Sequence, residues 1–273
     1  MTDFASLRSL LKRFGIWAQK KLGQHFLVDR QVLGEIVAAA EIAPGEEILE
    51  IGPGPGVLTH ELLKNGAKVS AIEIDEKILP VLKFTTKGFA RNLQIFHTHV
   101  LHFPIAILKS DFKIVANIPY HLTSPILRKF LAESERLPVK IVLLVQKEIA
   151  LKICGKKNSI LKMQVTPFGK PEMIATVGAA SFFPPPKVES AILKIDIFPE
   201  SKIKIYRRLF FKIFKIGFTH SRKMLKNNLA ATFKKSSRQI ESILEKCSIA
   251  KNARAENLGV EHWESLAQEF FAN

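Results

Sequence analysis

The chain has 273 residues, of which 47% are hydrophobic and 24% charged, a balance that supports a packed core and excludes an intrinsically disordered chain. Its 41 Lys and Arg residues outnumber 25 Asp and Glu residues, so the net charge is +16 and a polyanion such as nucleic acid is the first partner to expect. Cys154 and Cys247 are too few and too far apart for a disulfide framework or a zinc site, and no apolar run approaches the roughly 18 residues of a membrane span.

The first 21 residues are basic and amphipathic, with Arg8, Lys12 and Arg13 placed among leucines such as Leu10. This pattern leaves two interpretations open, a transit peptide or a basic helix that faces RNA. Asp3 disfavours the transit peptide, because such segments are poor in acidic residues.

Short apolar runs alternate with helical stretches along the first 199 residues. We predict strands at residues 47–51, 68–74, 93–97, 112–116, 139–146 and 191–197. This alternation indicates an α/β, Rossmann-like fold with a mostly parallel sheet covered on both faces. From residue 200 onward the apolar residues follow helical spacing, as at Leu225, Leu229 and Phe233. We therefore predict an α/β domain over residues 1–199 and a small helical domain over residues 200–273.

A glycine-rich turn follows the first predicted strand, where residues 50–59 read EIGPGPGVLT. Gly52 and Gly54 let the backbone approach a ligand at the carboxyl edge of the sheet. The third glycine of a dinucleotide fingerprint would fall on Val57 and is absent, and two prolines remove amide donors that a pyrophosphate needs. A ligand without phosphates fits this loop better. The alternative is a tight structural turn without a ligand.

Glu73 lies in the second predicted strand, about 20 residues after the glycine loop, where a carboxylate of an α/β crevice accepts hydrogen bonds from both ribose hydroxyls. S-adenosylmethionine presents a nucleoside without a pyrophosphate, so the loop and Glu73 together predict this cofactor. A surface glutamate with no ligand is the alternative interpretation.

Residues 117–120 read NIPY and follow the fourth predicted strand. The tetrapeptide suits methylation of the exocyclic N6 of adenine, which is a poor nucleophile because its lone pair is delocalised into the ring. The side-chain oxygen of Asn117 and the carbonyl of Ile118 would accept the two N6 hydrogens and favour the pyramidal form. Pro119 biases Ile118 toward an extended conformation, and Tyr120 would stack on the flipped base. The alternative is a polar turn with a buried tyrosine.

A second aromatic site is Phe182, which lies shortly before three prolines and Lys187. A rigid proline run would present Phe182 to the other face of the base, while Lys187 would meet a phosphate. The alternative is a loop that packs Phe182 into the core.

Residues 201–273 carry 15 Lys and Arg residues against 6 Asp and Glu residues. Arg222, Lys223 and Lys226 lie close together, and Arg222 and Lys226 share one face if this segment is a helix. We predict that these three residues contact RNA phosphates. A solvated charged face is the alternative.

Together these motifs resemble the ribosomal RNA adenine N6,N6-dimethyltransferases of the small subunit, a family that also includes the erythromycin-resistance methylases and the mitochondrial transcription factor B proteins. Besides the glycine loop, Glu73 and residues 117–125, the resemblance includes LGQHFL at 22–27, VQKE at 145–148, the Phe182 loop, FTHSRKML at 218–225 and RAE at 254–256. It implies dimethylation of two adjacent adenosines near the 3′ end of small-subunit (16S-type) ribosomal RNA during ribosome assembly.

By matched position, the resemblance implies that His25 and Leu27 touch the methionine end of S-adenosylmethionine, that Gly52 belongs to its binding loop, and that Glu73 holds its ribose. It places Asn117 at the reaction centre, in contact with the cofactor. We expect a cytoplasmic monomer whose partners are the small ribosomal subunit and its RNA, with no metal and no membrane.

One position departs from the family, in which an aspartate after the third strand contacts the adenine amino group of the cofactor, whereas this chain has His99. A neutral histidine accepts one hydrogen bond, so we expect His99 to take over this contact with altered affinity. Two other functions stay open. Because His99 replaces the aspartate of the family, one alternative is a non-enzymatic RNA-binding assembly factor. The other is a nicotinamide-dependent oxidoreductase, which shares the fold but which Val57 and the NIPY tetrapeptide disfavour.

Overall fold

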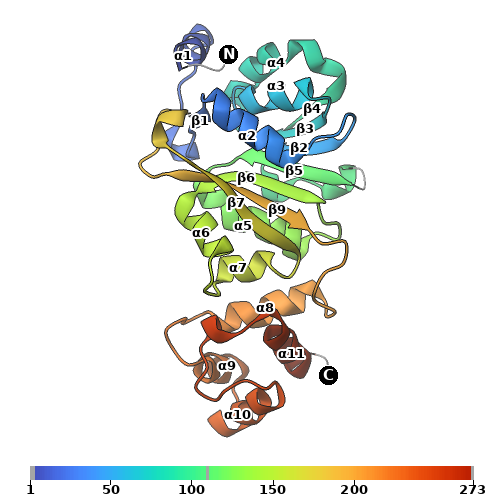
Figure 1. The fold of residues 1–273 in the computed structure, drawn as a ribbon, viewed down its shortest axis with the longest axis vertical. Coiled ribbons are helices and arrows are strands. Elements are labelled where there is room, and N and C mark those ends of the chain that lie inside the picture. The colour runs from blue at the N-terminus through green and yellow to red at the C-terminus, as the bar shows by residue number, and fades with distance from the viewer. Residues whose placement is uncertain (1–3, 109–110, 272–273) are drawn as a thin grey trace.

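A computed structural model describes residues 4–108 and 111–271 and places their strands in two sheets (Figure 1). The main sheet has seven strands in the order β4-β3-β2-β5-β6-β9-β7, and a separate sheet pairs β1 with β8. The strands are β1 (Phe26–Leu27), β2 (Glu47–Ile51), β3 (Lys68–Glu73), β4 (Leu93–His97), β5 (Phe112–Asn117), β6 (Lys140–Gln146), β7 (Gly169–Val177), β8 (Phe182–Phe183) and β9 (Ser190–Ile197). The six predicted strands are confirmed, each within one residue of its predicted ends.

Helices cover both faces of the main sheet (Figure 1). The α-helices of the described residues are α1 (Phe4–Arg13), α2 (Arg30–Ala40), α3 (Val57–Lys64), α4 (Leu79–Thr85), α5 (Thr123–Leu127), α6 (Lys147–Cys154), α7 (Ile160–Val165), α8 (Arg207–Gly217), α9 (Leu225–Phe233), α10 (Ser237–Lys246) and α11 (Val260–Phe271). Among these described helices, none is both long and apolar enough to cross a membrane.

The central strands are apolar on both faces because both faces are covered. In β2, Ile48 packs into a buried cluster with Leu33 of α2 and Leu62 of α3. The next residue, Leu49, points to the opposite face and joins a second cluster that includes Ile126 of α5. This arrangement confirms the predicted α/β fold with a mostly parallel sheet.

The five strands β2 to β6 are parallel, so their carboxyl ends lie at one edge of the sheet. The chain runs outward from β2 to β3 and β4, then returns to form β5 on the other side of β2. An open α/β sheet forms its ligand crevice at such a reversal, outside the carboxyl ends of the strands. The strand order therefore brings the residues that follow β2 and β5 together at one crevice.

The sequence patterns do not predict β1, β7 and β8. Strand β7 lies at the edge of the sheet, pairs with β9, and exposes alternate side chains that include Lys170 and Glu172 beside Pro171. An edge strand with charged residues and a proline lacks the apolar run that marks a buried strand. Strands β1 and β8 have two residues each, too short for any pattern, and exist because they pair with each other.

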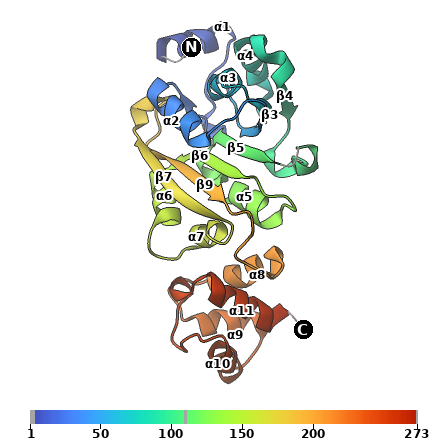
Figure 2. The same ribbon diagram turned by 45° about the vertical axis from the view of Figure 1, so that its right-hand side comes forward.

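The described residues after β9 form only helices as regular secondary structure, and α8–α11 gather beyond the sheet, at the end of the molecule opposite α1 (Figure 2). The apolar core does not stop at residue 200. Phe210 and Phe214 of α8 belong to the same buried cluster as Phe130 and Phe168 of the α/β part. The domain boundary at residues 199–200 stays a prediction, and one continuous core crosses it.

Helix α1 forms part of the basic N-terminal segment, of which residues 1–3 lie outside the described residues. Leu7 and Leu11 are buried in a cluster with Ile78 and Val81. Arg8 is among the basic side chains that remain exposed. The amphipathic pattern of residues 4–13 is thus explained by packing on the α/β domain, and a role in targeting stays untested.

Helices α8 and α11 meet at Gly217, where a Cβ would overlap the fully buried indole of Trp263. We expect Gly217→Ala to lower the free energy of unfolding by about 1–3 kcal/mol, because the core cannot expand without strain. Gly34 in α2 is the matched control, since a Cβ there meets nothing within 4 Å. Gly34→Ala should raise stability by about 0.5–1 kcal/mol. Urea unfolding measures both variants, and equal effects would contradict this packing argument.

Candidate active site

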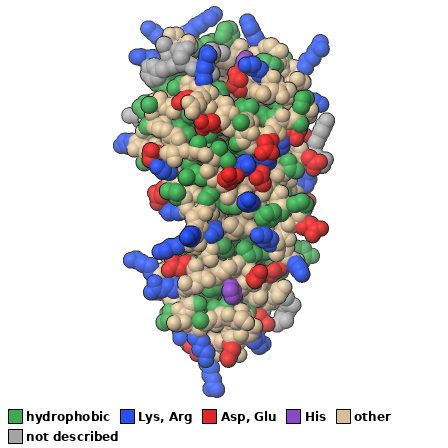
Figure 3. All heavy atoms as spheres, viewed as in Figure 1, with side chains coloured by type: hydrophobic (Ala, Val, Ile, Leu, Met, Phe, Trp, Pro, Cys, Tyr) green, Lys and Arg blue, Asp and Glu red, His purple; other side chains and the backbone are tan. Residues whose placement is uncertain are grey.

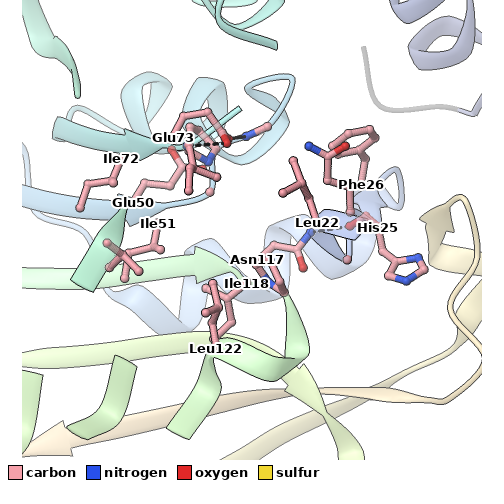
Figure 4. Close-up of a pocket in the computed structure, with 18 of the residues that line it drawn as sticks. Leu22, His25, Phe26, Glu50, Ile51, Ile72, Glu73, Asn117, Ile118 and Leu122 are labelled. Atoms are coloured by element: carbon pink, nitrogen blue, oxygen red, sulfur yellow. Dashed lines mark hydrogen bonds between the residues drawn. The ribbon is translucent and has the colours of Figure 1, made fainter. Parts of the chain in front are cut away.

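A pocket opens at the carboxyl edge of the main sheet (Figure 4). Its walls come from residues 50–55, 57 and 58, which end and follow β2, from 72–74 at the end of β3, from 98–100 after β4, and from 117–122, which end and follow β5. Residues 21–27 of the N-terminal segment complete the wall. The structure therefore brings together the glycine loop, Glu73, His99, the NIPY tetrapeptide and His25, which are far apart in the sequence.

The glycine loop uses its own amides internally. Gly52, Gly54 and Gly56 all have positive φ angles, between +54° and +84°, which glycine adopts without strain. Their N–H groups donate to the Ile72 carbonyl at 2.9 Å, to Glu73 Oε2 at 3.1 Å and to the Pro53 carbonyl at 3.0 Å, respectively. These three glycines therefore have no free amide to bind a phosphate, which supports the prediction of a ligand without phosphates.

Glu73 is a buried carboxylate at the end of β3, 5% exposed, and Figure 4 shows it facing the glycine loop. Its Oε1 accepts hydrogen bonds from the backbone N–H groups of Ile74 at 2.8 Å and Asp75 at 2.9 Å. Burial raises the pKa of Glu73 above its ordinary value, although the backbone donors, Gly54 included, favour the ionised form. The carboxylate is thus fixed in position at the pocket wall.

Glu50 is a second pocket carboxylate that the sequence analysis misses. It lies at the end of β2, is 1% exposed, and its Oε2 has no hydrogen-bond partner among the described residues. Burial raises its pKa to about 8, and the nearby charge of Glu73 contributes to the shift. A charged residue in the apolar run 47–51, directly before the glycine turn, is the signal that could have identified it.

Asn117 ends β5, and its side-chain orientation is fixed by one hydrogen bond. Nδ2 donates to the backbone carbonyl of His25 at 2.9 Å. A carbonyl can only accept, so this bond assigns the amide nitrogen to His25 and leaves Oδ1 as an acceptor at the pocket. Figure 4 shows Asn117 between the end of β5 and the His25 segment.

The residues after Asn117 turn sharply along the pocket. The Ile118 side chain is buried in the core, and Pro119 has extended backbone angles, φ −55° and ψ 131°. The Tyr120 hydroxyl lies 2.7 Å from the buried Ser190 hydroxyl, and its ring lies nearly parallel to the His25 ring at a centroid distance of 6.0 Å. Burial raises the pKa of Tyr120, so its hydroxyl stays protonated. Tyr120 is therefore held at the pocket by two neighbours.

The N-terminal segment is held over the pocket by Asp75, another residue that the sequence analysis misses. Its Oδ2 accepts hydrogen bonds from the side-chain amides of Gln19 at 3.0 Å and Gln24 at 2.9 Å. Gln24 Oε1 in turn accepts from the Gln19 backbone N–H at 2.8 Å. Because these partners are more than 50 residues apart in sequence from Asp75, no local pattern predicts them.

His25 and Leu27 both line the pocket, as the family resemblance implies. His25 Nδ1 lies 2.7 Å from the carbonyl of Pro184, to which it must donate because a carbonyl only accepts. Leu27 belongs to β1 and is 3% exposed. The pairing of β1 with β8 thus fixes Leu27 at the wall, and the bond to the Pro184 carbonyl fixes His25.

The structure corrects the expected position of Phe182. Its side chain is 2% exposed and packs in the buried cluster with Leu27 and Ile192. It does not line the pocket, since Phe182 pairs with Leu27 in the two-stranded sheet and points into the core. Phe182 is therefore not placed to stack on a base. Lys187 is exposed and also lies outside the pocket lining.

The structure also corrects the expected role of His99. Its Nδ1 already accepts a hydrogen bond from the Leu101 backbone N–H at 3.1 Å. A neutral imidazole has only one acceptor nitrogen, so His99 cannot accept a further hydrogen bond from a ligand amino group.

The basic C-terminal residues differ in exposure and pairing. Arg222 and Lys223 are exposed in the turn before α9, so Arg222 does not share a helical face with Lys226. Lys226 lies in α9, and its Nζ forms an ion pair with Glu241 of α10 at 2.7 Å. Figure 3 shows Lys and Arg side chains projecting at both ends of the molecule, over α1 and over the C-terminal helices.

The described residues contain no group of three or more His, Cys, Asp and Glu side chains placed to hold a metal ion.

The contacts of Asp75 predict a local effect on the N-terminal segment. Asp75→Ala removes two hydrogen bonds to a carboxylate, so amide hydrogen exchange at residues 19–26 should accelerate about tenfold or more. The exposed neighbour Glu76 provides the control, and Glu76→Ala should leave these rates unchanged. Mass spectrometry of the exchanged protein measures both. Unchanged protection in Asp75→Ala would show that this carboxylate does not hold the segment.

The raised pKa of Glu50 predicts how stability depends on pH. The unfolded chain ionises Glu50 near the ordinary value of 4.5, whereas the folded protein keeps the proton until about pH 8. Between these values the folded state binds more protons, so this group lowers the free energy of unfolding as pH rises, by up to about 1.4 kcal/mol per unit. The free energy of unfolding of Glu50→Gln should therefore rise relative to that of the wild type as pH increases from 4.5 to about 8, and the difference between the two should stay constant above that pH. Urea unfolding at several pH values measures the difference, and a constant difference would refute the shift.

The chain matches the profile of the ribosomal RNA adenine dimethylase family over residues 17–271. It is 39% identical to a ribosomal RNA small subunit methyltransferase A of Dehalococcoides mccartyi (strain CBDB1), over 98% of this chain and 94% of the relative. It is 34% identical to a protein of the same name in Alkaliphilus metalliredigens (strain QYMF), over 97% and 96% of the two chains.

Solved structures give the same result. A dimethyladenosine transferase from Plasmodium falciparum has a TM-score of 0.75 and 27% identity, covering 90% of this chain and 97% of that chain. The 23S rRNA methyltransferase ErmE has a TM-score of 0.67 and 27% identity, covering 89% and 98%. The resemblance carried by the sequence motifs is thereby confirmed, and this chain belongs to the ribosomal RNA adenine dimethylase family.

Proposed function

We propose that this protein transfers methyl groups from S-adenosylmethionine to N6 of two adjacent adenosines near the 3′ end of small-subunit ribosomal RNA. The observation that carries the proposal is the orientation of Asn117. Its Nδ2 is tied to the His25 carbonyl, which leaves Oδ1 as a fixed acceptor at the pocket. A preorganised acceptor of this kind suits an amino group whose lone pair must be localised before it reacts.

The pocket fits S-adenosylmethionine, a nucleoside that has no phosphate and carries a sulfonium. The N–H groups of the three loop glycines donate to internal acceptors, and Glu50 and Glu73 line the pocket without a Lys or Arg partner in the described part of the chain. An ionised Glu73 repels a pyrophosphate and attracts a cation, and the protonated Glu50 offers a pyrophosphate no positive charge. This combination disfavours a nicotinamide dinucleotide. When bound, S-adenosylmethionine supplies an electrophilic methyl group.

Each side chain has a specific task in this proposal. Glu73 accepts hydrogen bonds from the ribose hydroxyls with the lone pairs that the backbone leaves free. Asn117 Oδ1 and the Ile118 carbonyl accept the two hydrogens of adenine N6 and favour its pyramidal form. Tyr120, oriented by Ser190, stacks on the flipped base and holds N6 in line with the methyl group.

The substrate in this proposal follows the names of the relatives, which specify the small ribosomal subunit. The excess of positive charge supports an RNA partner, and Lys187, Arg222 and Lys223 offer exposed cations for phosphates. We include in the proposal that the protein acts in the cytoplasm, as a monomer, on the assembling subunit.

The direct test is transfer of radiolabelled methyl groups to small ribosomal subunits that lack the modification, followed by nucleoside analysis. We expect N6,N6-dimethyladenosine at two adjacent positions. A binding protein without enzymatic activity would bind the particle and transfer no label, and this outcome would leave only the assembly-factor alternative.

Asn117→Ala separates binding from turnover. We expect the methylation rate to fall about 10²- to 10³-fold, because the acceptor acts on N6 as it becomes pyramidal. Affinity for S-adenosylhomocysteine, measured by calorimetry, should fall much less. Equal losses in rate and affinity would assign Asn117 a purely structural role through its bond to His25.

The exposed pair Arg222 and Lys223 predicts a salt-dependent contact with RNA. Arg222→Ala with Lys223→Ala should weaken binding to ribosomal particles. The slope of the logarithm of affinity against the logarithm of salt concentration should also become shallower, by the amount that corresponds to the loss of about two phosphate contacts. Lys235→Ala with Arg238→Ala removes the same charge from exposed positions of the same helical region. Particle binding across a salt series compares them, with thermal melting as a folding check. Identical salt slopes in the two double variants would show that Arg222 and Lys223 contribute only to the overall positive charge and make no specific contact with RNA phosphates.

A further inference from the structure

The hydrogen bond at His99 determines which of its ring nitrogens carries a proton. His99 follows β4, lines the pocket and caps the short helical turn Val100–His102. Its Nδ1 lies 3.1 Å from the Leu101 backbone nitrogen, which donates. Nδ1 must therefore present its lone pair, and in a neutral imidazole the proton then resides on Nε2. Protonation of both nitrogens would turn Nδ1–H against Leu101 N–H and break the cap.

Only one nitrogen of His99 remains available to a ligand. Nδ1 is turned back toward its own helical turn, and Nε2 lies on the other side of the ring. The structure shows no hydrogen bond from Nε2 to any of the described residues. His99 thus offers the pocket a hydrogen-bond donor and no acceptor.

The strand order indicates which part of the cofactor lies beside His99. The reaction centre at Asn117 ends β5, and the proposed ribose site at Glu73 ends β3, while His99 follows β4, the outermost strand on that side. A nucleoside whose ribose lies at Glu73 and whose reactive end points to Asn117 must direct its base toward β4. The base therefore lies beside residues 98–100.

We propose that His99 recognises the purine base of the cofactor by donating a hydrogen bond from Nε2 to a ring nitrogen of the base, and that it makes no hydrogen bond to the 6-amino group. This inference rests on the proposed function. The 6-amino group of adenine is a donor, whereas the ring nitrogens N1 and N7 beside it are acceptors. A donor at Nε2 pairs with a ring nitrogen and cannot pair with the amino group. An aspartate at this position has the opposite capacity, because a carboxylate only accepts.

The proton position can be measured without any ligand. Long-range proton–nitrogen correlation spectra of the full chain, labelled at histidine nitrogens, distinguish the two neutral forms and the doubly protonated ring. The His99 signals are assigned by their absence in His99→Asp. We expect the Nε2–H form. An Nδ1–H form, in which Nε2 is an acceptor, would overturn the proposal.

Calorimetry with cofactor analogues tests the contact itself. The probes are S-adenosylhomocysteine and its analogue without the 6-amino group. In the wild type, loss of the amino group should weaken binding less than about threefold, whereas in His99→Asp it should cost about tenfold or more, because a carboxylate then loses its partner. The control is His220→Asp, which makes the same charge change at an exposed histidine outside the pocket lining and should behave as wild type.

The wild type alone also tests the proposal if His99→Asp fails to fold. The 1-deaza and 7-deaza analogues each lack one ring acceptor, and one of them should lose about fivefold or more in affinity. Retention of affinity by both, or an amino-group loss as large in wild type as in His99→Asp, would overturn the proposal. If S-adenosylhomocysteine itself fails to bind, the proposed function fails together with the base contact, whereas the measured proton position still stands.

Discussion

The buried carboxylate of Glu73 is the interaction on which the pocket depends. It accepts hydrogen bonds from the backbone N–H groups of Gly54, Ile74 and Asp75, and so ties the glycine loop to the end of β3. A buried carboxylate is costly unless donors surround it, and the Gly54 amide in turn finds its acceptor in Glu73. The position of Gly54 and the position of the carboxylate therefore stabilise each other.

The same network continues from Asp75 across the pocket to the reaction centre. Asp75 binds the side chains of Gln19 and Gln24, and these hold the segment that contains His25. The His25 carbonyl then accepts the hydrogen bond that orients Asn117. A change at the proposed ribose site is thus connected by contiguous hydrogen bonds and short backbone steps to the acceptor proposed for N6, and the N-terminal segment is the link between them.

The two edges of the sheet have opposite electrostatics. At the amino edge, Lys113 pairs with Glu46 at 2.7 Å, and Lys140 pairs with Asp196 at 3.0 Å. Bonds to these lysines lower the pKa values of Glu46 and Asp196 in spite of their burial. At the carboxyl edge, burial raises the pKa values of Glu50 and Glu73, and no lysine or arginine in the described residues forms an ion pair with either. Carboxylates at the amino edge are thus paired with lysines, whereas the carboxyl groups at the ligand edge have no cationic partner and Glu50 holds its proton up to about pH 8.

The sequence by itself determined the central strands, the family and the residues of the pocket that follow strands, because apolar runs and glycine turns are local properties of the chain. It also indicated a ligand without phosphates, and the internal use of the Gly54 amide supports this interpretation. Only the tertiary structure decided that Phe182 is buried, that Lys226 is paired, that Asp75 holds the N-terminal segment and that His99 has already used its acceptor. These outcomes depend on which partner lies within hydrogen-bonding or packing distance. Such partners are chosen by the fold, and even the nearby partner of His99 is chosen by a backbone conformation that residue types alone do not specify.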